Sequence, residues 1–343
     1  MKPPTVFLAL ASFLGLAAFS NAAVLTVDNK PGAVAMFTSF QAAYNAAQAD
    51  DTIMLAGSPT VYSAPTIYKR IHIVGPGYMF GGNQIPGINT DSASISLDFV
   101  KNSQFGDPSG SSVSGVAATI GSTTNSNGNF PVPLSVSRCR IQYGGGFGPG
   151  SSVRESLFEG SLDIYGSTSV RNCIFMNYIY VNGVGNTFSN CTVFSQQSGH
   201  LTVRSDTNES TSWSNTVFVN SVYTAQSFAS AKIGSVTHSI AVGNSILPEG
   251  RASFLPEGGG NINGFNLTDV FVSSGNVETR WMLKATSPAI ASGFNGVDMG
   301  AFGGANPYRL SGVAPRPRIT RLVVPAAATD ATGLRFEVDA KAF

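Results

Sequence analysis

A short phrase of alternating apolar and polar residues recurs through the middle of the chain. Residues 135–141 read SVSRCRI, residues 152–158 read SVRESLF and residues 169–175 read SVRNCIF, so the phrase begins every 17 residues. Related phrases follow at looser spacing: SNCTVF at 189–194, SNTVF at 214–218 and THSIAVGN at 237–244. An apolar residue at every second position indicates short β-strands, because successive side chains of a strand point to opposite faces.

The length of the repeat distinguishes between repeat architectures. Helical repeats need about 33–47 residues per unit, and leucine-rich repeats carry a leucine signature that these phrases lack. Units of 17 or 18 residues, punctuated by Gly and Asn, suit a parallel β-helix in which each repeat forms one coil. The pattern therefore predicts an all-β solenoid.

Each residue of the phrase has an expected place in the coil. Val170, Cys173 and Phe175 should point inward, with Ile174 facing out between the last two. Stacked coils lie about 4.8 Å apart, so like residues should form columns. Corner asparagines should adopt left-handed backbone geometry and hydrogen-bond from coil to coil. The predicted inward column is Ile141, Phe158, Phe175, Val193 and Phe218, and the predicted corner column is Asn172, Asn190 and Asn215.

The first part of the chain predicts a cap for the solenoid, whose open end would expose unpaired strand edges. Thr38 lies three residues before Gln41, as in a capping box. Phe40, Ala43, Tyr44 and Ala47 recur at helical spacing, so the helix should have one apolar face. We expect this amphipathic helix to cover the first coil, followed by strands at 51–55 and 70–75.

Two segments carry a resemblance to a known family. Residues 50–78 (DDTIMLAGSPTVYSAPTIYKRIHIVGPGY) follow the predicted helix, and residues 283–304 contain SPAI and then DMGAF. Together they resemble the opening and closing segments of secreted bacterial right-handed parallel β-helix proteins of the pectin-lyase-like group. The resemblance implies a right-handed parallel β-helix over residues 23–308, including the cap helix. Residues 309–343 would form a short C-terminal β tail, with alternating Leu334, Phe336 and Val338.

Residues 1–22 are typical of a secretory signal peptide. Lys2 precedes an uncharged apolar run from Val6 to Phe19, and small residues follow around Ala22. The run is too short to span a bilayer comfortably, and nothing later in the chain is long enough. The sequence thus predicts a secreted or cell-envelope protein, without a membrane span once the signal is removed.

Composition narrows the expected partners. Only 11% of the residues are charged and the formal net charge is +1. No basic cluster of the kind that binds nucleic acid is visible. The histidines His72, His200 and His238 lie far apart without metal-ligand spacing, so neither a metal nor another cofactor is expected. Three cysteines in so long a chain do not indicate a disulfide scaffold.

One set of charged residues is the candidate ligand-binding site. Arg154 and Arg171 occupy the same place in adjacent 17-residue coils and should stack. Two guanidinium groups can bind an acidic sugar through bidentate hydrogen bonds, with Glu155, Glu159 and Asp163 nearby. The alternative, which the sequence favours, is a solvated corner where Glu155 offsets the arginine repulsion, because exposed ion pairs contribute little.

Other residues have structural interpretations that compete with functional ones. Asp50-Asp51 is expected to be a pair of polar residues that marks the end of the helix. His72 alternates with Ile71 and Ile73 and should face solvent or a neighbouring loop, and no partner carboxylate for it is visible in the sequence. Tyr178 and Tyr180 alternate with Ile179 and Val181, so one pair should face outward, where tyrosine can stack on sugar rings or simply fill the sheet.

Two functions fit these observations. The first is an exported, non-catalytic scaffold that contacts a polysaccharide or cell-surface glycan. The alternative is a polysaccharide lyase or glycoside hydrolase acting on an acidic polysaccharide, for which the family's enzymes use clustered acids. The sequence shows no dense cluster of outward acids on adjacent coils, so it favours the scaffold. Catalytic residues cannot be assigned.

Overall fold

The computed structural model describes residues 22–83, 91–121, 132–194, 203–205, 211–214, 216–219, 233–243, 255, 257–315, 318–323 and 336–341. The predicted signal peptide, apart from Ala22, lies outside these described residues, as does His200. No helix within them is both long and apolar enough to cross a membrane.

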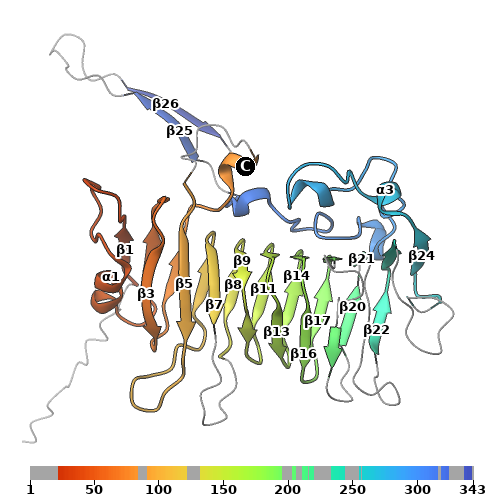
Figure 1. Cartoon of the computed structure of the whole chain (residues 1–343), viewed down its shortest axis with the longest axis horizontal. Helices are drawn as coiled ribbons and strands as arrows, with labels where there is room; N and C mark the ends of the chain where they lie inside the picture. The colour runs from red at the N-terminus through yellow and green to blue at the C-terminus, as the bar shows by residue number, and fades with distance from the viewer. Residues whose placement is uncertain are drawn as a thin grey trace, which may run out of the picture.

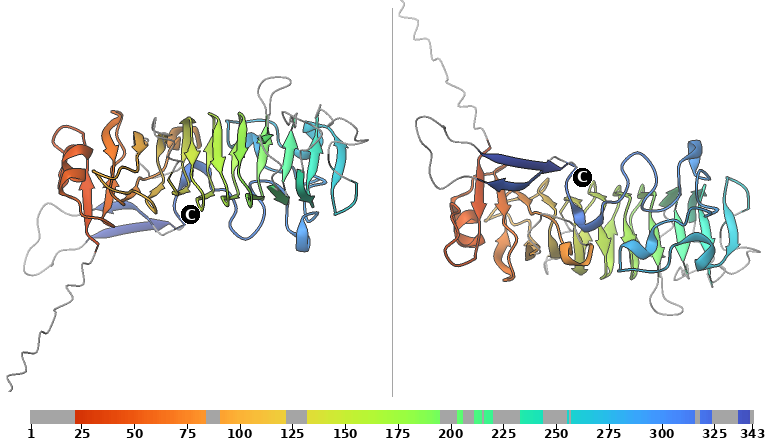
Figure 2. Two further views of the ribbon diagram at one scale, coloured as in Figure 1. Left: turned by 90° about the horizontal axis from the view of Figure 1, so that it is seen from below. Right: turned by 90° about the horizontal axis from the view of Figure 1, so that it is seen from above.

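The chain folds as a parallel β-helix, as the repeat predicted, and the coils stack along one long axis (Figures 1 and 2). Within the described residues three parallel sheets run along this axis. The first sheet has ten strands: β1 (Val24–Val27), β2 (Thr52–Leu55), β4 (His72–Val74), β6 (Ser112–Ser114), β8 (Ser135–Ser137), β11 (Ser152–Arg154), β14 (Ser169–Arg171), β17 (Thr187–Ser189), β20 (Thr211–Ser214) and β22 (Ile233–Thr237).

The other two sheets complete the coils. The second sheet also has ten strands in the described part of the chain: β3 (Tyr62–Ile67), β5 (Ser94–Phe99), β7 (Ala117–Gly121), β9 (Arg140–Tyr143), β12 (Leu157–Phe158), β15 (Ile174–Phe175), β18 (Thr192–Phe194), β21 (Val217–Val219), β23 (Ile240–Val242) and β24 (Ile262–Phe265). The third sheet is shorter and contains β10 (Gly146–Phe147), β13 (Leu162–Tyr165), β16 (Ile179–Asn182) and β19 (Val203–Ser205).

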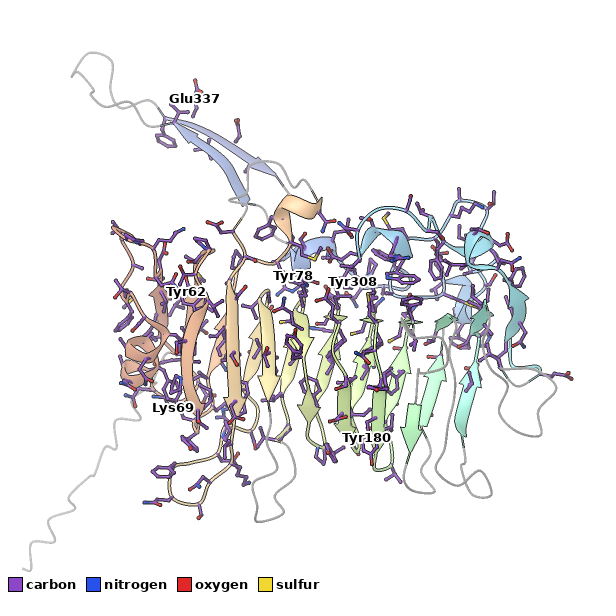
Figure 3. The ribbon with its side chains drawn as sticks, viewed as in Figure 1. Tyr62, Lys69, Tyr78, Tyr180, Tyr308 and Glu337 are labelled. Carbon is purple, nitrogen blue, oxygen red and sulfur yellow. The ribbon has the colours of Figure 1, made fainter. Side chains whose placement is uncertain are left out.

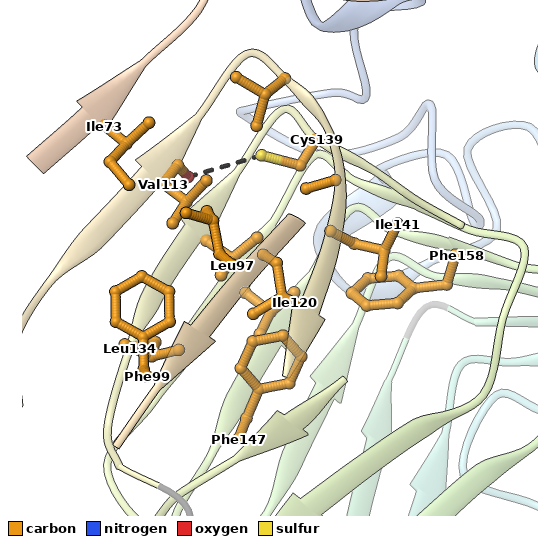
Figure 4. Close-up of a cluster of buried hydrophobic side chains, with 14 of the residues drawn as sticks. Ile73, Leu97, Phe99, Val113, Ile120, Leu134, Cys139, Ile141, Phe147 and Phe158 are labelled. Atoms are coloured by element: carbon orange, nitrogen blue, oxygen red, sulfur yellow. Dashed lines mark hydrogen bonds between the residues drawn. The ribbon is translucent and has the colours of Figure 1, made fainter. Parts of the chain in front are cut away.

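The repeated phrase is in register from coil to coil. Ser152 pairs with both Ser135 and Ser169, and Val153 with the corresponding valines. Val170 and Cys173 are 0% exposed and Phe175 is 1% exposed, which confirms their inward positions. Figure 4 shows Cys139 in the interior, where its thiol donates to the carbonyl oxygen of Val113 at 3.6 Å.

Aromatic rings fill the interior beside the second sheet. The rings of Phe158 and Phe175 stack with centroids 5.0 Å apart, and Phe175 meets Phe188 edge-on at 6.3 Å. The backbone of Phe175 is in register with Val193, which is fully buried. The predicted column is therefore confirmed at these coils. Phe218 continues it in backbone register.

The corners between the first and second sheets form a column of left-handed residues, which we call the corner column: Arg138, Glu155, Asn172, Asn190 and His238, with φ between +49° and +53°. The predicted left-handed geometry of Asn172 and Asn190 is confirmed, while Asn215 lies outside the described residues. Ordinary side chains disfavour this conformation, so five in one column mark a turn that every coil must make.

The predicted cap helix is α1 (Phe40–Ala46), and it packs against β1, β2 and β3. Phe40, Ala43 and Tyr44 are buried, which confirms the apolar face. The N-cap is Ser39 rather than Thr38, because the hydroxyl of Ser39 accepts from the Ala42 amide at 3.3 Å. The solenoid also begins earlier than expected, since β1 precedes the helix and pairs with β2.

The coils end sooner than the sequence indicated. Residues 267–313 contain no strand, although the β-helix was expected to extend to residue 308. They form α3 (Leu267–Val270) and the 3-10 turns η1 (Thr279–Trp281), η2 (Phe294–Gly296) and η3 (Leu310–Gly312). This segment, which we call the C-terminal strap, runs back along the outside of the solenoid (Figure 1).

The strap covers outward apolar side chains of the second sheet. Ile174 faces out from its strand, as predicted, yet it is 0% exposed. It shares a buried cluster with Leu157 of the preceding coil and with Trp281 and Met299 of the strap. Burial of this apolar surface is the main force that holds the strap in place.

The strap follows the corner column back toward the N-terminus. The Asn190 amide donates to the carbonyl oxygen of Asp298 at 3.1 Å, and that of Asn172 donates to Gly303 at 2.7 Å. These amides bind the strap, whereas the sequence led us to expect bonds from coil to coil. Beyond it lie the short helix α2 (Phe80–Asn83), which contacts η3, and a projecting antiparallel hairpin, β25 (Arg318–Val323) with β26 (Glu337–Lys341).

Candidate functional site

The outer face of the first sheet carries two rows of polar side chains. Register pairs place Ser112, Ser135, Ser152 and Ser169 in one row, since each occupies the same position in its strand. The second row contains Ser114, Ser137, Arg154 and Arg171 in the same strands. The valines between the rows point inward and are buried. The repeated phrase SVS or SVR thus forms a polar face on this sheet. One row of the face contains serines, and the other contains serines and arginines.

A shallow cavity of about 370 Å³ opens on this face, and we call it the serine–arginine groove. Five serines, two arginines and three apolar residues line it: Ser112, Ser114, Ser135, Ser137, Ser152, Arg138, Arg154, Val74, Val136 and Ala314. The guanidinium of Arg138 donates to the Ser114 hydroxyl at 2.6 Å, so the Arg138 side chain is held against the surface of the groove. Sequence reasoning missed Arg138 and the serines, although their repeated position in the phrase was the available signal.

The predicted stacking of two arginines is present in the backbone register. Arg154 pairs directly with Arg171, and both side chains are exposed. Arg171 donates to the Ser169 hydroxyl at 3.3 Å. Within the described part of the chain neither guanidinium forms an ion pair, and Glu155 forms none with them. The two charged side chains therefore face solvent together, without an ion pair to a described carboxylate.

The three predicted acids lie on different parts of the coil. Glu155 is at the corner, beside the arginines. Glu159 lies beyond β12, where it accepts two hydrogen bonds of 3.0 Å from Arg140. Asp163 is on β13 of the third sheet. The chain turns between these positions, so acids close in sequence are separated in space, and Arg154 and Arg171 share their face with hydroxyl groups instead.

A second polar group forms near the N-terminal end of the same face. His72 Nδ1 lies 2.8 Å from the Ser112 hydroxyl, and His72 Nε2 lies 3.9 Å from Asp50 Oδ1. The carboxylate that the sequence did not reveal is thus Asp50. Its hydrogen bond to Arg70 lowers its pKa. Because 3.9 Å exceeds hydrogen-bonding distance and Arg70 already holds the carboxylate, the base-orienting bond of a catalytic triad is not formed.

The neighbouring acid has the predicted structural role. Asp51 is buried and accepts hydrogen bonds from the amides of Ala23 and Gln48, both at 2.7 Å. It therefore ties the end of the helical segment to the first strand.

Other candidate chemistry is scarce in the described residues. No group of three or more His, Cys, Asp or Glu side chains among them is placed to hold a metal ion. The three cysteines are buried and free, and burial raises the pKa of the Cys139 thiol to about 11. His238 occupies the corner column, with its ring 5.3 Å from that of Phe294 of the strap.

The third sheet presents aromatic side chains outward. Ile179 and Val181 are fully buried, whereas Tyr178 is 46% exposed and Tyr180 is partly exposed. The tyrosines are thus the outward pair. Tyr180 lies in register with Asp163 of the preceding coil, on the side of the solenoid away from the strap (Figure 3).

Comparison with known proteins adds no further constraint. No protein-family model matches the chain, and a search of curated proteins found no match. The fold and the geometry described above are therefore the basis for assigning a function.

Proposed function

We propose that the protein is an exported, non-catalytic β-helix of the pectin-lyase-like kind that binds an acidic polysaccharide or cell-surface glycan. The observation that carries this proposal is the pair Arg154 and Arg171, stacked in register at the serine–arginine groove and without an ion pair among the described residues. Guanidinium groups bind carboxylates through paired hydrogen bonds, and an uncompensated pair favours an anionic ligand.

The repeating geometry suits a polymer better than a small molecule. Hydroxyl groups recur at each coil, about 4.8 Å apart, along β6, β8, β11 and β14. A uronate chain lying along the axis would offer carboxylates to the arginines and hydroxyls to the serines. The open, shallow groove leaves the ligand partly in water, so we expect weak binding at each site and stronger binding to longer chains.

Titration calorimetry with uronate hexasaccharides at low and physiological salt tests the proposal. We expect saturable binding that weakens with salt, because exposed charges are screened over about 8 Å at physiological ionic strength. The double variant Arg154→Ala/Arg171→Ala should bind at least about tenfold more weakly, since each charged hydrogen bond contributes about 1.5–3 kcal/mol. The fold should remain intact because both side chains are exposed.

A matched variant separates the site from general charge. Lys101→Ala/Lys284→Ala removes the same number of positive charges from exposed positions elsewhere and should bind like the wild type. No binding by the wild type, or an equal loss in the lysine variant, would overturn the proposal. Shortened or unsaturated products after incubation with the same oligosaccharides would instead establish the lyase or hydrolase alternative.

A further inference from the structure

A second polar and aromatic surface lies on the outer face of the third sheet. It consists of Asp163 and Tyr165 on β13, of Tyr180 on β16, and of Tyr178, which directly precedes β16. We call these four residues the tyrosine face. Its sheet is separate from the one that carries the serine–arginine groove, so the two surfaces point in different directions from the solenoid.

The backbone register places an aromatic ring beside a carboxylate. Asp163 pairs with Tyr180 across the strands, which puts their side chains on the same outer row about 4.8 Å apart. On its other side Asp163 pairs with Gly146, which has no side chain. The carboxylate therefore has a tyrosine on one side and, on the other, a residue without a side chain.

The carboxylate of Asp163 has no internal partner within the described residues, in hydrogen bonds or in ion pairs. Partial burial raises its pKa, and the same charge contributes, after burial, to a raised pKa of Tyr165. A carboxylate that is partly removed from water and has no hydrogen-bond partner binds a hydroxyl donor well. Folding has already removed part of its water, so binding a ligand costs less further desolvation.

We infer that the tyrosine face binds a neutral sugar residue, with the ring of Tyr180 under the apolar face of the pyranose and Asp163 accepting from its hydroxyl groups. Pyranose rings expose C–H groups on their faces, and the negative face of an aromatic ring attracts these polarised hydrogens. Hydroxyl groups around the rim are hydrogen-bond donors to a carboxylate. A uronate is disfavoured here because Asp163 repels a second carboxylate.

This inference goes beyond the proposed function, because it assigns a different ligand class to a different sheet. A glycan with both acidic and neutral residues would meet both surfaces, but each surface can be tested alone. Titration calorimetry with neutral hexasaccharides of glucose, mannose and galactose, at millimolar concentration, is the direct measurement. We expect saturable binding of at least one of them, with little dependence on salt.

Variants at the tyrosine face identify the contact. Tyr180→Ala should weaken this binding about tenfold, and Tyr180→Phe should largely preserve it, because the ring is kept. Asp163→Asn should weaken it by a smaller factor, since a neutral amide accepts more weakly than a carboxylate. Phe105→Ala removes a 59% exposed ring from a different loop and serves as the control, with unchanged binding.

The outcomes separate this inference from the proposed function. Circular dichroism and the unfolding midpoint check each variant, and Tyr178→Ala replaces Tyr180→Ala if the latter does not fold. Loss of neutral-sugar binding in these variants, with uronate binding retained, supports the inference. Absence of saturable binding to all three hexasaccharides, or wild-type affinity in a folded Tyr180→Ala protein, overturns it whatever the uronate result.

Discussion

The side-chain amide of Asn172 donates a hydrogen bond of 2.7 Å to the carbonyl oxygen of Gly303, 131 residues later in the chain. It also donates to the Ala301 carbonyl at 3.0 Å. Asn172 is 7% exposed and its φ is +52°, so one residue both turns the coil and fixes the strap. The corner asparagines thus connect the coils in the middle of the chain to a segment that lies 108 to 131 residues later.

Replacing this amide should loosen the strap. Asn172→Asp keeps the size of the side chain but removes both donors and points a carboxylate at two carbonyl oxygens, so we expect a loss of about 2 kcal/mol or more in the free energy of unfolding. Hydrogen exchange should increase first around residues 298–304. Glu155→Ala is the control, because it changes a side chain at the same left-handed corner one coil earlier. It measures how far the strap responds to a substitution at such a backbone position without the loss of the Asn172 amide. Equal exchange in the strap of both variants would contradict this role.

The aromatic stack gives a prediction about stability. Phe175 is buried between coils against Phe158 and Phe188. Phe175→Ala should lower the free energy of unfolding by about 3–5 kcal/mol, through lost burial and the cavity that remains. Denaturant unfolding followed by circular dichroism measures it, with Tyr143→Ala, at a 73% exposed ring, as the near-neutral control.

A buried carboxylate predicts a pH dependence. Glu278 accepts from the Tyr308 hydroxyl at 2.5 Å, from the Ser311 amide at 3.0 Å, and from Asn83. Burial nevertheless raises its pKa above the ordinary value of 4.5. The folded state therefore holds the proton more tightly than the unfolded state. The stability that the protonated Glu278 carboxyl gives the folded state is fully present below about pH 4.5. It is lost as the pH rises through the pKa that Glu278 has in the folded state.

Comparison with a neutral variant isolates this effect. Glu278→Gln has no titratable group at this position, so its stability should not show this loss. As the pH rises from 4.5 toward neutrality, the wild type should therefore lose stability relative to the variant. Urea unfolding of both proteins at several pH values measures the difference. A difference that stays constant across this range would show that the Glu278 pKa is not raised.

The cysteines predict a chemical result. Burial raises the pKa of Cys139 to about 11 and that of Cys191 to about 12, and it raises that of Cys173 well above the ordinary value. The thiolate is the reactive form, so the folded protein should react very slowly with a thiol reagent at pH 8. Three equivalents should react after denaturation, as all three cysteines are free. Rapid labelling of the native protein would contradict the interior column.

The coil was predictable because its signals are local and repeated. Val170, Cys173 and Phe175 alternate within a few residues, and the 17-residue spacing fixes which residues lie above them. The same spacing placed Arg154 opposite Arg171. These inferences need only the period of a strand and the constant length of a coil.

The strap was not predictable by the same means, since it depends on contacts between distant segments. Alternation correctly turned Ile174 outward but says nothing of what covers it. An apolar residue facing out in consecutive coils, as at Leu157 and Ile174, was the available signal of a covering segment. The separation of Glu159 and Asp163 from the arginines was likewise hidden, because it depends on where the chain turns.

The strap also fixes the number of coils between its two ends. Repeat solenoids can in principle gain or lose a unit, since each coil contacts only its neighbours. Here Asp298 is bound at Asn190, while Ser311 accepts from the Tyr78 amide at 2.8 Å, several coils away. Removing one coil between these points would shorten the solenoid by about 4.8 Å and leave the strap out of step with its anchors. A repetitive fold thereby acquires a defined length, and with it a fixed number of coils beneath the groove.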